Sequence, residues 1–330
     1  MMMKKLFTVL LLGSVALSSV QAHENHGSHD SAGHTPGDLK LIGDSHGEIA
    51  VAENGEIYVS VLGGPKAGIQ VYDSKGKYLR NIPGAPKDFH GFTLLKEGDK
   101  QVIYGAGLDS GVITKMDLQG KVLLQIKPDV IPDKYKKKGK TPLKLTAVSV
   151  GPQGELYVVD GYGLDFIHKF SAEGKYLKTF GGREAPYHFN NLHKIYVDMR
   201  FEPARLLCTN RAKGTLVHLS LDGKFIEIHA EKLRRPSAVA FRGEEIALAE
   251  INGRVTLLNK EGEITATLSR NDQKYRGNRA KPEEWEDGIV WSPHGICYDN
   301  EGNVLVTEYS KWGRVLKFSV PEKQKKTEED

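Results

Sequence analysis

Hydrophobic and polar residues alternate with a period of two in short runs along the chain, and each clear run follows a glycine turn. Three examples read ENGEIYVSV at 53–61, PQGELYVVD at 152–160 and NEGNVLVTE at 300–308. Glycine turns followed by β-branched and aromatic residues are typical of hairpins. Helical periodicity is nowhere sustained over three turns, which argues against crossover helices. The pattern therefore predicts an all-β fold.

These runs belong to an internal repeat with two recurring marks. Turns of the form polar-Gly-Lys/Glu recur five times, at Gly76, Gly120, Gly174, Gly223 and Gly262. An apolar column recurs six times, at Ile69, Ile113, Ile167, Leu216, Val255 and Val315. Its spacing runs from 39 residues (216 to 255) to 60 residues (255 to 315), the range of four-stranded blades with insertions. We predict a six-bladed β-propeller whose ring is closed by an N-terminal strand at 39–43.

The two ends of the chain differ from the repeat in composition. Lys4 and Lys5 precede an apolar run that ends in a small-residue pattern at Ala22, as in a secretory signal peptide. An uncleaved membrane anchor is the alternative. We expect cleavage, and therefore a secreted or periplasmic protein. The predicted divisions are 1–22 signal peptide, 23–38 histidine-rich flexible linker, 39–319 six-bladed propeller and 320–330 charged tail.

Composition adds little about partners. The 330 residues are 27% charged with a formal net charge of +4, so charge supplies no argument for nucleic acid or a membrane surface. The linker histidines can bind copper or zinc, or belong to a tail that binds metals loosely or not at all.

Cys208 and Cys297 lie in apolar strand-like runs, which favours buried free thiols over a disulfide. We expect a monomer that takes a small-molecule or peptide substrate in its central channel.

Candidate chemistry comes from one column of the repeat. Aligning the starts of the innermost strands gives Gly47, His90, Thr146, His193, Ser237 and His294. Because innermost strands line the channel, histidines on every second blade should point at one axial spot. Three imidazoles with an open fourth position form the catalytic arrangement of Zn2+, although other divalent transition metals also accept nitrogen ligands. The alternative is that the histidines plug the channel by hydrogen bonding to one another and to water.

Two levels of resemblance follow. Repeats such as GELYVVDGYG with IHKFSAEGKYLKTFG resemble the NHL repeat family. With three axial histidines on alternate blades, the chain resembles the lyase domain of peptidylglycine alpha-amidating enzymes. That resemblance implies zinc on His90, His193 and His294, a catalytic tyrosine at Tyr162 in the DGY motif, and a substrate-binding arginine at Arg211 in TNRAKG. It also implies cleavage of a peptidyl α-hydroxyglycine into a peptide amide and glyoxylate.

The chain departs from this family at several positions. The family has a further substrate-binding arginine early in the propeller, where this chain offers only Lys66. The family's calcium-binding aspartate after the third histidine is Gly295 here, which leaves Ca2+ open. The family's cysteine after DGY is Gly163, which leaves its local disulfide open.

Other functions remain open at this point. A non-catalytic NHL propeller that binds a protein or polysaccharide partner is the main alternative to a lyase. A propeller hydrolase of the gluconolactonase or strictosidine-synthase type ranks last, because such sites favour oxygen ligands for calcium and the column found here is nitrogen. Two insertions, at 127–145 and 270–293, are long enough to serve as lids over a site.

Overall fold

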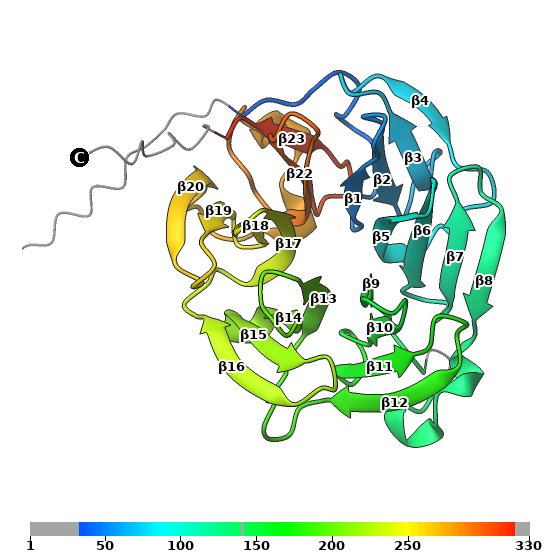
Figure 1. Ribbon diagram of the computed structural model, residues 1–330. Coiled ribbons are helices and arrows are strands. Elements are labelled where there is room, and N and C mark those ends of the chain that lie inside the picture. Colours follow the sequence, from blue (N-terminus) through cyan, green and yellow to red (C-terminus); the bar gives the residue numbers. More distant parts are fainter. Residues whose placement is uncertain (1–32, 140–141, 321–330) are drawn as a thin grey trace, which may run out of the picture.

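The computed structural model describes residues 33–139 and 142–320. Six antiparallel sheets stand around a central axis, which confirms the predicted all-β six-bladed propeller (Figure 1). The predicted signal peptide, most of the predicted linker and all but the first residue of the charged tail lie outside the described residues. Within the described part, no helix is long and apolar enough to cross a membrane.

Each blade is a meander of consecutive strands with its first strand nearest the axis (Figure 1). The strands are, in blade 1, β1 (Ile49–Val51), β2 (Ile57–Val61), β3 (Gly68–Tyr72) and β4 (Tyr78–Asn81); in blade 2, β5 (Phe89–Glu97), β6 (Lys100–Gly107), β7 (Ile113–Asp117) and β8 (Val122–Ile126); in blade 3, β9 (Ala147–Val150), β10 (Leu156–Val159), β11 (Phe166–Phe170) and β12 (Tyr176–Gly181); in blade 4, β13 (Leu192–Asp198), β14 (Arg205–Asn210), β15 (Thr215–Ser220) and β16 (Phe225–Ala230); in blade 5, β17 (Pro236–Arg242), β18 (Glu245–Glu250), β19 (Arg254–Leu258) and β20 (Ile264–Arg270); and in blade 6, β21 (Pro293–Tyr298), β22 (Val304–Glu308) and β23 (Val315–Phe318). Short 3-10 helices interrupt the connections: η1 (Pro128–Val130), η2 (Asp133–Tyr135), η3 (Arg211–Lys213), η4 (Gly277–Arg279) and η5 (Pro282–Glu284).

The hydrophobic core is divided among the seams between neighbouring blades. One cluster joins blades 2 and 3, and includes Ile113 with Leu156 and Phe170. Because the period-two pattern puts apolar side chains on both faces of the middle strands, each sheet can pack against both of its neighbours. This stacking fixes the orientation of the innermost strands and hence of the residues that face the axis.

The ring is closed between blades 6 and 1 by an irregular segment. Backbone N–H groups of Ile42 and Val315 donate to the carbonyls of Gly313 and Leu39 at 3.1 and 2.9 Å, and Lys317 N–H donates to the carbonyl of His34. These contacts are isolated bridges, and no regular fourth strand forms at 39–43. The reason is local: Leu41 has a φ of 59°, which interrupts an extended strand. His34, assigned from the sequence to the linker, thus lies beside β23.

Both cysteines are free thiols, as predicted. Cys208 is buried on β14, and Cys297 lies on β21. Burial raises the pKa of each thiol well above its usual value, so neither is poised to react.

Candidate metal centre

The three histidines of the repeat column meet at the axis of the ring. His90 lies on β5, His193 on β13 and His294 on β21, the innermost strands of blades 2, 4 and 6. Their ring centroids are 4.8–4.9 Å apart in all three pairs, and all three side chains are fully buried. Histidine on alternate blades therefore gives a triangle of imidazoles.

A local irregularity turns each histidine toward the axis. The register of the innermost strand against its neighbour shifts at His90, at His193 and at His294. Such a β-bulge leaves an extra residue out of the ladder and changes the direction of its side chain. The histidines are therefore placed by backbone features that the surrounding sheets hold rigid.

The Nδ1 atom of each histidine is fixed by a carbonyl of the next blade. The pairs are His90 with Thr146 O at 2.9 Å, His193 with Ser237 O at 2.7 Å and His294 with Gly47 O at 3.0 Å. These acceptors are the residues that fill the same column in blades 3, 5 and 1. Because a carbonyl only accepts, each Nδ1 must carry the proton, which leaves an Nε2 lone pair on each ring.

Burial also keeps the imidazoles neutral. It is the largest cause that holds the pKa of His90, His193 and His294 well below the usual 6.5. For His193 the next cause is the charge of Arg211. Neutral imidazole is the form that binds a metal ion, so the protonation state at neutral pH suits a ligand.

Tyr162 reaches this triangle from the loop between β10 and β11. A Cβ at Gly161 would collide with the carbonyl oxygen of Leu192, and a Cβ at Gly163 would collide with the Asp160 carboxylate. The two glycines therefore permit a turn that larger residues would block. The hydroxyl oxygen of Tyr162 lies 3.2 Å from the Nε2 atoms of both His90 and His193.

Arg211 approaches from the loop between β14 and β15, where η3 begins. Its Nη2 donates to the Tyr162 hydroxyl at 3.0 Å, and its Nε donates to Asn191 Oδ1 at 2.5 Å. Asn191 in turn donates to the carbonyl of Gly161 at 3.1 Å, which ties the two loops together. The Nη1 of Arg211 is buried without a hydrogen-bond partner in the described part of the chain. The structure thus brings together all five residues chosen from the sequence.

Further residues at the centre were not predicted. His46, just before β1, places its Nε2 3.2 Å from the Tyr162 hydroxyl. Burial, the first cause, and the charges of Arg211 and Lys194 lower the pKa of His46 to about 3. His46 adjoins Gly47, so examining neighbours of the histidine column could have found it.

A second guanidinium and a second phenol also lie near Tyr162. The charge of Arg235 acts on the pKa of both Tyr162 and Tyr275, and the Nε of Arg235 is buried with no partner among the described residues. Tyr275 comes from the insertion at 270–293, so a residue of that insertion is close enough to the centre to interact electrostatically with Tyr162 and Arg211. Arg235 therefore offers a cation in the absence of the early arginine implied by the resemblance.

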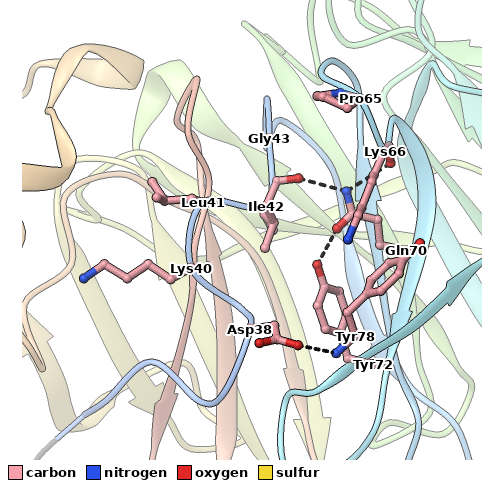
Figure 2. Close-up of a pocket in the computed structure, with 10 residues that line it drawn as sticks. All are labelled: Asp38, Lys40, Leu41, Ile42, Gly43, Pro65, Lys66, Gln70, Tyr72 and Tyr78. Atoms are coloured by element: carbon pink, nitrogen blue, oxygen red, sulfur yellow. Dashed lines mark hydrogen bonds between the residues drawn. The ribbon is translucent and has the colours of Figure 1, made fainter.

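Lys66, the nominal substitute for that arginine, occupies another place. Its ammonium lies 3.5 Å from the ring centroid of Tyr78. Both residues line a pocket between the ring-closing segment and blade 1 (Figure 2). Nothing in these contacts connects Lys66 with the histidines.

The residues at the axis fit a zinc ion in their donor chemistry and in the spacing of their rings, and the ligand atoms of His46, His90 and His294 all lie within 4.8 Å of one another. Three imidazoles bound through Nε2 to one tetrahedral Zn2+ at about 2.0–2.1 Å would have ring centroids about 5 Å apart, close to the spacing here. The buried Nε2 of His294 has no hydrogen-bond partner within residues 33–139 and 142–320. A buried polar atom left without a partner is costly unless something binds it. Nitrogen ligands alone do not select zinc over other transition metals.

The layer next to the histidines does not fit a calcium ion. Lys194 and Glu48, each following a member of the histidine column, form an ion pair of 2.7 Å, with side chains 2% and 9% exposed. The Lys194 ammonium also donates to the carbonyl of His90 at 3.2 Å. A Cβ at Gly295 would lie 2.7 Å from Glu48 Oε1, so this glycine makes room for the pair. An ammonium occupies this layer, and calcium prefers a cage of oxygens.

A second group of metal-ligand types lies in the outer strands of blade 4. Ligand atoms of His218, Glu227 and His229 are all within 4.8 Å of one another. Arg205 donates to Glu227 at 2.7 Å, so a cation already neutralises this carboxylate. This group matters mainly for metal measurements, since it could bind added ions.

Comparison with known proteins shows the fold. The chain matches no family model and no curated protein sequence. A solved streptogramin B lyase is similar at 14% identity and a TM-score of 0.57, covering 87% of this chain and 97% of that chain. Virginiamycin B lyase from Staphylococcus aureus is similar at 13% identity and a TM-score of 0.55, over 86% of this chain and 98% of its own. A protein of unknown function from Bacteroides thetaiotaomicron VPI-5482 has 13% identity and a TM-score of 0.62, over 88% and 72%.

Proposed function

We propose that this chain is an exported, metal-dependent carbon–nitrogen lyase that acts on a peptidyl α-hydroxyglycine or a related small α-hydroxyamide. The observation that carries the proposal is the convergence of three neutral imidazoles, a phenol and a guanidinium on one axial spot. The solved propellers similar to this chain include two named as lyases, which supports lyase chemistry on this fold. Substrate would enter the central channel as a small molecule or peptide.

His90, His193 and His294 would hold the metal through their Nε2 atoms. The hydrogen bonds from Nδ1 to the three carbonyls orient the rings and fix their tautomer, which increases ligand basicity. A bound zinc ion supplies a Lewis acid that lowers the pKa of the substrate's hydroxyl group.

Tyr162 is the proposed general base. Burial is the largest cause that raises its pKa, while the charge and hydrogen bond of Arg211 oppose this. A nearby metal cation would favour the phenolate further. Tyr162 then takes the hydroxyl proton of the substrate, the carbon–nitrogen bond breaks as the carbon–oxygen bond becomes a carbonyl, and the proton passes to the departing amide nitrogen. The products are an amide and glyoxylate, so atoms and charges balance.

Arg211 is the proposed carboxylate clamp. Its Nη1 is buried and unpartnered, so a donor is available that the protein itself does not use. A guanidinium holds a carboxylate through two parallel hydrogen bonds, which a lysine cannot reproduce. Asn191 and the Tyr162 hydroxyl keep the other nitrogens in place, so the clamp is rigid before substrate arrives.

The test combines metal content with product formation. Purified protein in which the linker histidines His23, His26 and His29 are replaced by glutamine should retain about one equivalent of metal that His294→Ala and His193→Ala both lose. The same protein should release glyoxylate from α-hydroxyhippurate, and His294→Ala should not. His229→Gln, in the separate blade 4 group, is the control that should keep both properties.

Two results would count against the proposal. Metal content that is the same in wild type and His193→Ala would remove the metal centre. Metal that is lost in His193→Ala without any glyoxylate release in wild type would favour a non-catalytic propeller that binds a protein or polysaccharide partner.

A further inference from the structure

A fourth histidine stands at the centre outside the repeat column. The ring of His46 lies 4.8 Å from that of His90 and 4.8 Å from that of His294, measured between centroids. The ligand nitrogens of these three residues are all within 4.8 Å of one another. The Nε2 of His46 is 3.2 Å from the same Tyr162 oxygen that the Nε2 atoms of His90 and His193 contact. Imidazoles from blades 2, 4 and 6 and from the segment before β1 therefore surround one spot.

The position of His46 at the centre is set by the segment that closes the ring. Immediately before it, Gly43 and Ser45 donate to the carbonyls of Trp312 and Ser310 at 2.9 and 2.8 Å. On the other side, Gln70 Nε2 donates to the carbonyl of Ile42 at 2.8 Å (Figure 2). The position of His46 thus depends on contacts with both the last blade and the first.

The ring of His46 is held in place by blade 6. It lies 4.2 Å from the ring of Tyr309, between centroids, with an interplanar angle of 30°. Tyr309 lies in the loop between β22 and β23, next to Ser310, which accepts the Ser45 hydrogen bond. The ring-closing segment and the His46 side chain therefore both pack against the loop between β22 and β23.

The docking is made of isolated bridges and not of a regular ladder. Segments with few consecutive backbone hydrogen bonds open at a lower free-energy cost than interior strands. Leu39 and Ile42 of this segment are buried in the core between blades 1 and 6, and anything that binds His46 in its docked position should stabilise the closed segment further.

We propose that His46 is a fourth imidazole ligand of the metal centre, so that metal binding and docking of residues 39–46 stabilise each other. The inference rests on the proposed metal function of His90, His193 and His294. Four protein ligands close the coordination of zinc, whereas a catalytic site keeps one position open. His46 accordingly occupies the fourth position at rest and yields it to the substrate. By linkage, docking of the segment strengthens metal binding by the same factor by which bound metal strengthens docking.

Cobalt(II) and amide hydrogen exchange test this in the full chain, with His23, His26 and His29 replaced by glutamine. One equivalent of cobalt should give wild type a visible spectrum that azide, at a concentration that saturates the response of His46→Ala, does not change, because His46 holds the fourth position. His46→Ala should still bind one equivalent, at least about tenfold more weakly, and its spectrum should respond to azide. His168→Gln, which changes a buried histidine on β11, is the matched control and should behave as wild type.

Hydrogen exchange measures the coupling between metal binding and docking of residues 39–46, and it does not rely on enzymatic turnover. Cobalt should increase the protection of the Gly43, Asp44 and Ser45 amides in wild type and should leave it unchanged in His46→Ala. If His46→Ala matches wild type in affinity, azide response and protection, the inference is wrong and the three-histidine centre survives. If His193→Ala loses no cobalt relative to wild type, the proposed function fails together with this inference.

Discussion

Two adjacent layers of the channel differ in whether their buried polar groups have partners. The histidine layer leaves donors and lone pairs unused: Nε2 of His294 and Nη1 of Arg211 are buried without partners in the described residues. In the next layer, Lys194 and Glu48 satisfy one another, and the lysine also donates to a backbone carbonyl. Unused polar groups in a rigid frame suit a site that awaits a ligand, whereas a closed ion pair suits a structural plug.

The two layers also use the ring differently. Histidines on blades 2, 4 and 6 give a threefold arrangement, and carbonyls of the intervening blades orient them. The ion pair joins residues of blades 1 and 4, which stand opposite each other in a ring of six. Three histidines on alternate blades converge on one point of the axis, where an ion can bind. Two oppositely charged side chains from opposite blades instead meet at the axis and occupy it themselves. The comparison predicts that substitutions in the histidine layer, called the upper layer below, reduce the proposed activity, and that substitutions in the layer of Lys194 and Glu48, called the lower layer, reduce stability.

The largest expected effect belongs to the upper layer. Tyr162→Phe removes the proposed base while keeping the ring, so kcat should fall about 100-fold to 10,000-fold. Metal content and the unfolding midpoint should stay close to wild type. Glyoxylate release under single-turnover conditions measures the change. Tyr309→Phe is the matched control, because it also alters a phenol at the centre, and it should retain most activity.

The lower layer should respond through stability. Lys194→Met leaves the Glu48 carboxylate buried and unpaired, which should reduce the free energy of unfolding by about 3–5 kcal/mol. The double change Lys194→Met with Glu48→Gln should recover part of this loss, since it removes the buried charge. Denaturant titration measures both. A chelator selective for calcium should leave the wild-type unfolding midpoint unchanged, and a clear decrease would mean that calcium, not Lys194, stabilises this layer.

The sequence predicted the parts of this comparison that repeat. Six recurrences of the apolar column gave the blade number, and the alternation of His90, His193 and His294 gave the triangle, because equivalent positions in a ring share a height on its axis. Tyr162 and Arg211 came from a resemblance in their local motifs. The structure brings them into hydrogen-bond contact with each other.

Parts that do not repeat could not be predicted in this way. His46 lies in an irregular segment with positive φ at Leu41, outside any column. The β-bulges at the histidines change the direction of a side chain by inserting one residue in the ladder, and period-two counting does not detect them. Lys194 and Glu48 are 146 residues apart (194 − 48), so their pairing depends on which blades face each other across the axis. Inspecting the residue after each column position would have suggested it.

A smaller effect is expected from the clamp. Arg211→Lys keeps the positive charge and loses the planar fork, so KM for an α-hydroxyglycine substrate should rise about tenfold. Metal content should not change. A substrate analogue without the carboxylate should show no such difference between wild type and Arg211→Lys. Equal loss with both substrates would instead indicate that Arg211 acts through Tyr162.

The smallest effect concerns His168, which is buried like the histidines at the axis but lies outside their cluster. His168 on β11 is fully buried, its Nδ1 contacts Thr179 Oγ1 at 2.8 Å, and its Nε2 has no partner in the described chain. Burial lowers its pKa from 6.5 to about 4. Between these values the unfolded chain binds a proton that the folded chain does not, so stability present above pH 6.5 is lost as the pH falls toward 4.

His168→Gln should therefore make the free energy of unfolding less dependent on pH in this window, by up to about 3 kcal/mol. Denaturant titration of chelator-treated wild type and variant at pH 7 and pH 4.5 measures the difference. Activity at neutral pH should be unaffected, because His168 belongs to no group of metal-ligand side chains found among the described residues. An identical pH dependence in the two proteins would show that the pKa of His168 is the same in the folded and unfolded states. At the axis, the buried Nε2 of His294 also lacks a partner among the described residues, but there three further imidazoles, a phenol and a guanidinium surround the same spot, and we therefore propose a function for that nitrogen and none for His168.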